Sequence, residues 1–194
     1  MIFKKKDDED SFLRKFEADV AKTFGKEDAV FMPSGTMAQS IALLIHAKRQ
    51  QRHSPNDNEL STNNNDQDDH TRQYRHKFAC HPSCHLLLHE QDAYKELIGM
   101  DAIPVTSSSS DDSLHISPLK YEDVELALKN EYEASSSSLK SIITCLILEL
   151  PHRELGGKLT PWNDVKKIRQ LCEKEGIKFH CDGARIFEAS AGYG

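Results

Sequence analysis

The sequence predicts an α/β protein in which helices cover a mainly parallel sheet. Segments typical of strands and of helices alternate along the chain, and this order is characteristic of layered α/β domains. Residues 142–149, "IITCLILE", are apolar at nearly every position, as expected for a parallel strand buried on both faces. With 194 residues, the chain has the length of one domain with a sizeable core.

The chain opens with a predicted helix, a short strand and a second helix. Residues 11–24 place their larger apolar side chains on one side at the helical period, and Gly25 follows as a stop, so we expect an amphipathic helix. The run "AVFM" at 29–32 is typical of a short buried strand. The turn residues 33–35 then break the strand, and "TMAQSIALLIHA" resumes a helical pattern.

A long polar segment, residues 49–76, interrupts this pattern. It is rich in Asn, Asp and Gln and contains almost no apolar side chain. Such a segment cannot offset the entropy lost on ordering, so we interpret it as a disordered insertion within a folded region of residues 11–194. The serine runs 107–110 and 135–138 are interpreted as solvated loop expansions.

After the insertion the alternation resumes. Following "LLLH" at 86–89, we expect a helix over 91–100, a strand over 102–105 and a helix over 121–132. These elements precede the apolar strand 142–149, so they extend the layered pattern toward the middle of the chain.

The best-marked helix follows that strand. Thr160 is expected to cap it, Pro161 suits its first turn, and Gly176 ends it. Its inward side chains are predicted to be Val165, Ile168, Leu171 and Cys172. "IKFHC" at 177–181 supplies the next strand.

Composition limits the classes of partner. The net charge is −6 and the pI is near 5.9, so there is no basic surplus to attract nucleic acid or an anionic membrane. The N-terminus lacks an apolar targeting segment, and the longest apolar run is too short to cross a bilayer. The five cysteines are an odd number without a secretory context, so reduced thiols and a cytoplasmic location are expected.

Ser34, Gly35 and Thr36 stand where the first strand gives way to a helix. Backbone N–H groups and the positive end of the helix dipole at such a position suit a phosphate, and Gly35 lets the backbone approach closely. The same tripeptide is also an ordinary turn and helix cap, which the sequence alone favours.

Asp182 and Arg185 follow the strand at 177–181. An unpaired carboxylate at a buried strand end is costly, so Asp182 should have a cationic or hydrogen-bonding partner. Arg185 is one candidate, in a structural ion pair. Alternatively, Asp182 binds a protonated heterocyclic nitrogen and Arg185 holds a substrate carboxylate with its planar fork.

The motifs "FMPSGTMAQSIAL", "HLLLHEQDA", "LELPHRELGGKLTPW" and "HCDGARIFEA" occur in this order along the chain. Together they closely resemble the threonine aldolase and β-eliminating lyase family of pyridoxal-phosphate enzymes. The resemblance covers most of residues 11–194 and implies the large domain of the aspartate-aminotransferase-type fold (fold type I), in incomplete form. Shared fold alone would not imply the function, but the combination of SGT and DGAR is specific to this family.

The resemblance implies roles for particular residues. Ser34, Gly35 and Thr36 match the phosphate-binding residues, His85 the histidine that stacks on the pyridine ring, and Asp182 the partner of the pyridine nitrogen. Arg185 matches the ligand of the amino-acid carboxylate. His152 matches a histidine near the substrate hydroxyl, and Glu149 is expected to orient its neighbours.

A metal site is the alternative interpretation of His85. Cys80, His81, Cys84 and His89 surround it in the sequence and are residue types that bind zinc. Structural zinc sites usually pair one such knuckle with a second, and no second knuckle follows here. The sequence therefore favours a site without metal.

The family implies a lyase that cleaves a β-hydroxy-α-amino acid to glycine and an aldehyde, and that acts as a homo-oligomer. Its cofactor-binding lysine lies one strand beyond the DGAR motif, and no lysine of this sequence matches it. The small C-terminal domain is also not represented. We therefore expect a fragment with little or no turnover by itself; the alternative is a non-catalytic remnant that binds cofactor weakly or pairs with an intact homologue.

Overall fold

The structure, a computed structural model, describes residues 11–51, 76–106, 117–135 and 142–194. The chain divides into two compact units, Met1–Ala38 and Gln39–Gly194, and each is described by itself. Most of the predicted polar insertion, the first serine run and residues 136–138 of the second lie outside the described residues.

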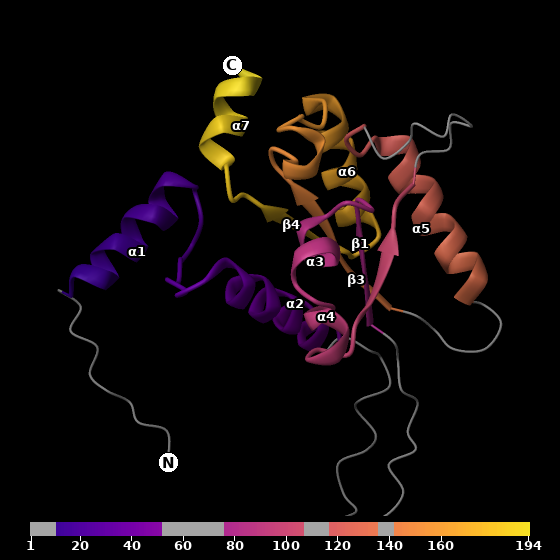
Figure 1. Ribbon diagram of the computed structural model, residues 1–194, viewed down its shortest axis with the longest axis horizontal. Helices are drawn as coiled ribbons and strands as arrows, with labels where there is room; N and C mark the ends of the chain where they lie inside the picture. The colour runs from indigo at the N-terminus through magenta and orange to yellow at the C-terminus, as the bar shows by residue number, and fades with distance from the viewer. Residues whose placement is uncertain (1–10, 52–75, 107–116, 136–141) are drawn as a thin grey trace, which may run out of the picture. The chain divides into compact units, whose positions relative to one another are not determined.

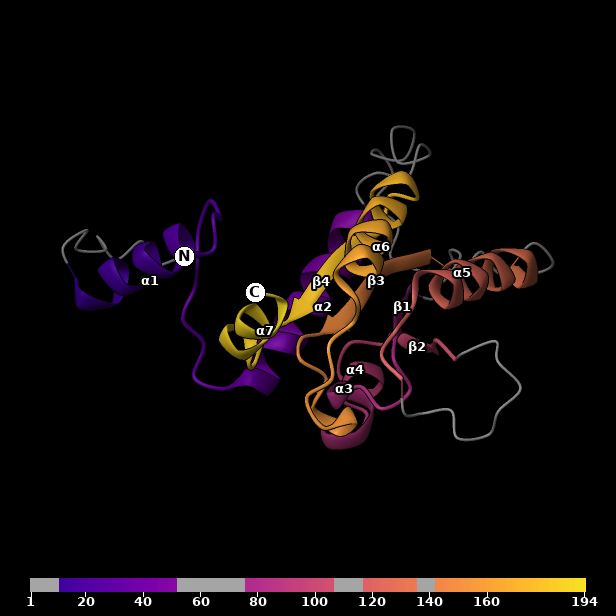
Figure 2. The same cartoon turned by 90° about the horizontal axis from the view of Figure 1, so that it is seen from above.

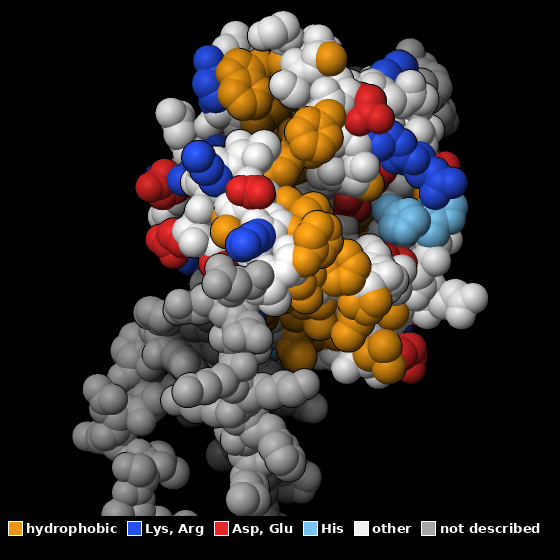
Figure 3. Space-filling view, turned by 90° about the vertical axis from the view of Figure 1, so that its left-hand side faces the viewer, with side chains coloured by type: hydrophobic (Ala, Val, Ile, Leu, Met, Phe, Trp, Pro, Cys, Tyr) orange, Lys and Arg blue, Asp and Glu red, His pale blue; other side chains and the backbone are white. Residues whose placement is uncertain are grey.

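The first unit contains the predicted amphipathic helix, α1 (Phe12–Thr23). Ser11 is its N-cap, because the side chain of Ser11 accepts a hydrogen bond from the backbone N–H of Arg14 at 3.3 Å. Gly25 has a φ of +60°, the left-handed conformation that commonly ends a helix. Helix and stop are confirmed, but several apolar side chains of α1 remain exposed: Phe12, Leu13 and Phe16. Exposed hydrophobic side chains are orange in Figure 3.

The short strand predicted at 29–32 is wrong. These residues form no strand, and Val30 and Phe31 are more than half exposed. A strand is stable only when a neighbouring strand pairs with its backbone, and within the described residues of the first unit there is none. The N–H of Phe31 instead donates to Oε1 of the buried Glu17 at 2.8 Å.

The second unit is built on a parallel four-stranded sheet, as the sequence predicts (Figure 1). Its strands in spatial order are β2 (Asp101–Pro104), β1 (His76–Cys80), β3 (Ile142–Glu149) and β4 (Lys178–Asp182). All three pairings are parallel, so the carboxyl ends of the strands lie at one edge of the sheet.

Strand β1 is one of the elements that the sequence analysis did not predict. Its segment "HKFAC" starts with two polar residues and has no clear alternation, yet Phe78 is completely buried at the centre of the sheet. The predicted insertion 49–76 is therefore too long at both ends. Residues 49–51 continue helix α2 (Gly35–Gln51), and His76 belongs to β1, where its backbone pairs with β3.

Helices cover both faces of the sheet (Figure 2). On one face, α2 and α3 (His85–His89) enclose a core that includes Leu43, Phe78 and Ile147, and α4 (Ala93–Glu96) lies next to it through Tyr94. On the other face, α5 (Tyr121–Ser135) and α6 (Trp162–Lys174) enclose the larger core. Each face of β3 is therefore buried, as its apolar sequence predicts.

Two predicted helices differ from the structure in detail. α4 is shorter than the predicted 91–100, because Gln91 and Asp92 adopt left-handed backbone conformations and only the helix after them is regular. In α6, Pro161 is the N-cap and no side chain caps the helix, so Thr160 is not a cap. The predicted inward side chains of α6 are all confirmed as buried: Val165, Ile168, Leu171 and Cys172.

Two short elements follow the sheet strands: η1 (Arg153–Leu155) comes after β3, and α7 (Ile186–Tyr193) comes after β4. All five cysteines are described and none forms a disulfide, as predicted. Among the described residues, no helix has the length and apolar character needed to span a membrane.

Candidate functional site

Two carboxylates mark the carboxyl ends of adjacent strands. Glu149 ends β3 and Asp182 ends β4, and the two residues are direct partners in the parallel register. The N–H of Leu150 donates to the backbone oxygen of Asp182 at 2.9 Å, which extends this pairing past the end of β3. Both side chains are largely buried. In open α/β sheets this edge is where ligands bind.

Asp182 is held by the backbone, not by Arg185. Its Oδ1 accepts a hydrogen bond from the N–H of Ala184 at 3.2 Å. Arg185 is exposed and stands at the N-cap of α7, and in the described part of the chain the two residues form no ion pair. The structural ion pair that the sequence left open is thus not formed, because the turn after β4 directs Arg185 into solvent.

His180 lies two residues before Asp182, and alternate residues of a strand share one face. Its ring nitrogens contact His46 of α2 at 3.3 Å and Gln39 of α2 at 3.0 Å. Burial lowers the pKa of His180 below its ordinary value of 6.5, although the charge of Asp182 opposes that shift. His180 is therefore neutral at neutral pH and does not offset the negative charge of Asp182.

Sequence reasoning did not single out His180. Its position two residues before an aspartate at a strand end was the available signal, because that spacing puts both side chains on one face of the strand.

Glu149 organises the loops around this edge. Its Oε1 accepts the N–H of Arg153 in η1 at 2.9 Å, and its Oε2 accepts the N–H of His85 at the start of α3 at 3.3 Å. The side chain of Cys84, the N-cap of α3, makes no capping hydrogen bond, and the buried carboxylate of Glu149 satisfies a backbone donor of this helix instead. Glu149, which is expected to orient its neighbours, thus accepts hydrogen bonds from two backbone segments.

His85 occupies the first position of α3, and 31% of its side chain is exposed. Its ring lies 5.0 Å from that of His89 between centroids, and its Nε2 is 3.7 Å from Oε1 of the buried Glu90. A partly exposed imidazole ring held by its neighbours can stack on a flat ligand, the role that the family resemblance implies for this residue.

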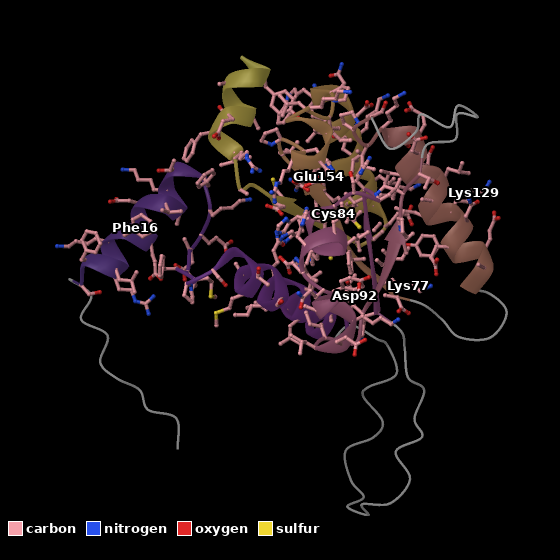
Figure 4. All side chains as sticks on the ribbon, viewed as in Figure 1. Phe16, Lys77, Cys84, Asp92, Lys129 and Glu154 are labelled. Atoms are coloured by element: carbon pink, nitrogen blue, oxygen red, sulfur yellow. The ribbon has the colours of Figure 1, made fainter. Side chains whose placement is uncertain are left out.

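His152 follows β3 and is buried. Its Nε2 is 3.0 Å from Oγ of Ser83, and its Nδ1 is 3.8 Å from Oε2 of Glu149. Ser83 in turn contacts Nδ1 of His81 at 2.9 Å. This cluster lies around α3 and η1, where Cys84 and Glu154 are labelled in Figure 4.

The first unit contains the predicted phosphate-binding residues. Oγ of Ser34 accepts the N–H of Met37 at 3.2 Å, so Ser34 caps α2 and the ordinary helix-cap interpretation of this residue holds. The N–H groups of Gly35 and Thr36 belong to the first turn, which has no intrahelical acceptors. A Cβ added to Gly35 would meet no atom within 4 Å, so space remains for a group to approach this helix end.

The structure does not assemble the zinc cluster considered from the sequence. No group of three or more possible metal-binding side chains converges in the described ranges. A hydrogen bond with Cys84, together with burial, raises the pKa of the Cys80 thiol, which disfavours the thiolate form that binds zinc. His89 contacts Oε1 of Glu154 at 2.9 Å instead, and this hydrogen bond lowers the pKa of Glu154.

Comparison with protein families and curated proteins gives concordant results. The sequence model of the family described as "Beta-eliminating lyase" matches residues 5–194. A low-specificity L-threonine aldolase of Arabidopsis thaliana is 25% identical over 185 residues, which are 95% of this chain and 42% of that protein. The low specificity L-threonine aldolase of Saccharomyces cerevisiae is 28% identical over 184 residues, covering 94% of this chain and 38% of that protein.

Solved structures extend the comparison. A Listeria monocytogenes EGD-E protein assigned as an L-allo-threonine aldolase superposes with a TM-score of 0.67 and 32% identity, over 93% of this chain and 39% of that chain. A protein of Exiguobacterium sp. 255-15, assigned as an aromatic amino acid beta-eliminating lyase/threonine aldolase, gives a TM-score of 0.67 and 30% identity, over 94% and 40%. The chain spans about two fifths of the length of these relatives.

Proposed function

Because the chain belongs to the Beta-eliminating lyase family, we propose that the protein containing it is a pyridoxal-phosphate-dependent aldolase. Its substrate would be a β-hydroxy-α-amino acid such as threonine, cleaved to glycine and an aldehyde. The observation that carries this proposal is the carboxylate of Asp182, which is buried at a strand end, held by one backbone N–H and left without a cationic partner among the described residues.

Pyridoxal phosphate, when bound, would supply an electron sink for the electron pair left on the α-carbon when the Cα–Cβ bond breaks. Asp182 would hold its ring nitrogen in the protonated form, since a buried carboxylate favours a cation beside it. His85, with its partly exposed ring, would lie against one face of the pyridine. The chemistry of these two side chains therefore fits the cofactor.

The phosphate would bind in the first unit, at the N-terminus of α2. Gly35 and Thr36 offer backbone N–H groups of the first helical turn, and no atom of the described residues fills the space beside Gly35. Ser34 contributes mainly by capping the helix, because its hydroxyl oxygen already accepts the N–H of Met37.

Arg185 and His152 would act on the substrate. The exposed guanidinium of Arg185 would bind the substrate carboxylate through two parallel hydrogen bonds. His152 would accept the proton of the β-hydroxyl group as the Cα–Cβ bond breaks, which is the role of a general base in an aldol cleavage. The carboxylate of Glu149, 3.8 Å from Nδ1 of His152, would stabilise the proton that His152 takes up.

By resemblance to the family, the protein would work as a homodimer in the cytoplasm. Residues 1–194 by themselves would release little or no glycine, because none of their lysines matches the family's cofactor-binding lysine. The aldolase proposal is tested by the release of glycine from threonine, with and without added pyridoxal phosphate, by the protein that contains this chain.

A substitution of Gly35 separates a phosphate site from a simple helix cap. Gly35→Ala adds a Cβ that meets no protein atom within 4 Å, so the free energy of unfolding should not fall. We expect the affinity for pyridoxal phosphate to weaken roughly tenfold, because the added methyl group occupies the space in front of the helix end. Equilibrium binding of the cofactor measures this, and an unchanged affinity would mean that Gly35 only begins a helix.

A further inference from the structure

We propose that Ser83 and His81 are positioning residues that hold His152 in a single tautomer, with its hydrogen on Nε2 and its basic nitrogen, Nδ1, facing Glu149. The inference rests on the proposed aldolase function and adds to it two residues that no family resemblance pointed to. The inference follows from a series of hydrogen bonds that links the backbone carbonyl of Ser117 to His152. In this series, the donor and acceptor of each hydrogen bond fix those of the next.

The first histidine in this series of hydrogen bonds is His81, which is buried. Its Nε2 lies 3.1 Å from the backbone oxygen of Ser117, and a carbonyl oxygen only accepts, so Nε2 carries hydrogen. Its Nδ1 lies 3.0 Å from the backbone nitrogen of Ser83, whose N–H only donates, so Nδ1 carries the lone pair. These two backbone contacts make His81 neutral and fix its tautomer.

The hydroxyl group of Ser83 links His81 to His152. Its Oγ is 2.9 Å from Nδ1 of His81, and because Nδ1 is an acceptor, the hydroxyl must donate its single hydrogen there. The same Oγ is 3.0 Å from Nε2 of His152. Since the hydroxyl hydrogen is already used, Oγ can only accept from His152, and Nε2 of His152 therefore carries hydrogen.

His152 is left with Nδ1 as the ring nitrogen that carries the lone pair and can accept a proton. The carboxylate of Glu149 is the acidic group beside it, at 3.8 Å, and both side chains are about 5% exposed. Among the described residues, the groups near His152 also include the ring of His81, 4.5 Å away between centroids, and the carboxylate of Glu154, which interacts with His152 electrostatically. A proton taken from a substrate hydroxyl would therefore rest on Nδ1, next to the negative charge of Glu149.

Removing the hydroxyl of Ser83 should reverse the tautomer. In Ser83→Ala, Nε2 of His152 has lost its acceptor and the carboxylate of Glu149 becomes the nearest one, so the hydrogen should move to Nδ1. A His152 with hydrogen on Nδ1 no longer presents its lone pair beside Glu149. We expect kcat for glycine release to fall at least tenfold with little change in KM, because a general base is lost while substrate binding is not.

The tautomer of His152 can be measured by NMR, without an activity assay. The protein that contains this chain is labelled with ¹⁵N-histidine, and long-range ¹H–¹⁵N correlations show which ring nitrogen of His152 carries hydrogen; His152→Gln assigns the signal. The expected result is hydrogen on Nε2 in the wild type and in Ser83→Thr, which keeps the hydroxyl, and on Nδ1 in Ser83→Ala. Ser83 is only partly buried, so neither variant should unfold the protein.

His81 provides a second pair of variants. In His81→Asn the amide oxygen replaces Nδ1 as the acceptor for Ser83, so the wild-type tautomer of His152 should be retained, whereas His81→Phe should lose it. An unchanged tautomer in Ser83→Ala, or hydrogen on Nδ1 in the wild type, would overturn the inference. If the wild type releases no glycine, the proposed function fails, and the tautomer measurement still decides whether Ser83 and His81 position His152.

Discussion

Replacing Asp182 with asparagine is expected to lower kcat/KM for aldol cleavage on the order of 10²–10³-fold, the usual effect of losing one preorganised electrostatic group in an active site. Asparagine has the shape of aspartate, and its Oδ1 can still accept the N–H of Ala184, so the turn after β4 should persist. The amide carries no charge, however, and cannot keep a ring nitrogen protonated. The loss should therefore fall on chemistry rather than on folding.

Two controls make the Asp182→Asn result specific. The free energy of unfolding should stay within about 0.5 kcal/mol of the wild type, as for most substitutions that break no buried contact. Asp19→Asn, which removes the same charge from an exposed position of α1, should leave both quantities unchanged. If Asp182→Asn retained wild-type kcat/KM, the buried carboxylate would have no part in cofactor chemistry.

Replacing Glu149 with alanine is expected to destabilise the protein by about 3 kcal/mol. The carboxylate accepts the backbone N–H groups of His85 and Arg153, and alanine would leave both donors without an acceptor in a buried region. Hydrogen bonds to a charged group contribute about 1.5–3 kcal/mol each, and water entering the space would recover part of that loss. Denaturant-induced unfolding measures the change.

Glu149→Gln is the matched variant. Its side-chain oxygen can keep one of the two N–H donors, while its amide group faces the other, so an intermediate loss of about 1–2 kcal/mol is expected. A loss below about 0.5 kcal/mol in Glu149→Ala would contradict the claim that this carboxylate holds the start of α3 and η1 in place.

Local sequence patterns predicted the elements whose burial is complete or strictly periodic. β3 is apolar along its whole length because both faces are covered, and α6 repeats its apolar residues on the side that packs on the sheet. β1 could not be found in this way, since its polar first residues conceal a strand whose place depends on pairing with β2 and β3. The run 29–32 has the composition of a strand. Whether such a run forms a strand depends on pairing with a neighbouring strand, and the described residues of the first unit contain none.

The site was predictable only as separate motifs. Spacing put Asp182 and Glu149 at strand ends, and the parallel register explains why they are neighbours. The contacts of Glu149 with two backbone N–H groups, and the series His81, Ser83 and His152, depend on how the loops after β1 and β3 fold toward each other. No residue spacing encodes those loop conformations, so the sequence alone could not supply them.

The most direct test of the aldolase assignment is glycine release from threonine by the protein expressed from the complete transcript that encodes residues 1–194. The account predicts equimolar glycine and aldehyde, formed only when pyridoxal phosphate is present and nearly abolished in Asp182→Asn. Cleavage that continues without the cofactor, or no cleavage of any β-hydroxy-α-amino acid by a folded protein that binds pyridoxal phosphate, would contradict it.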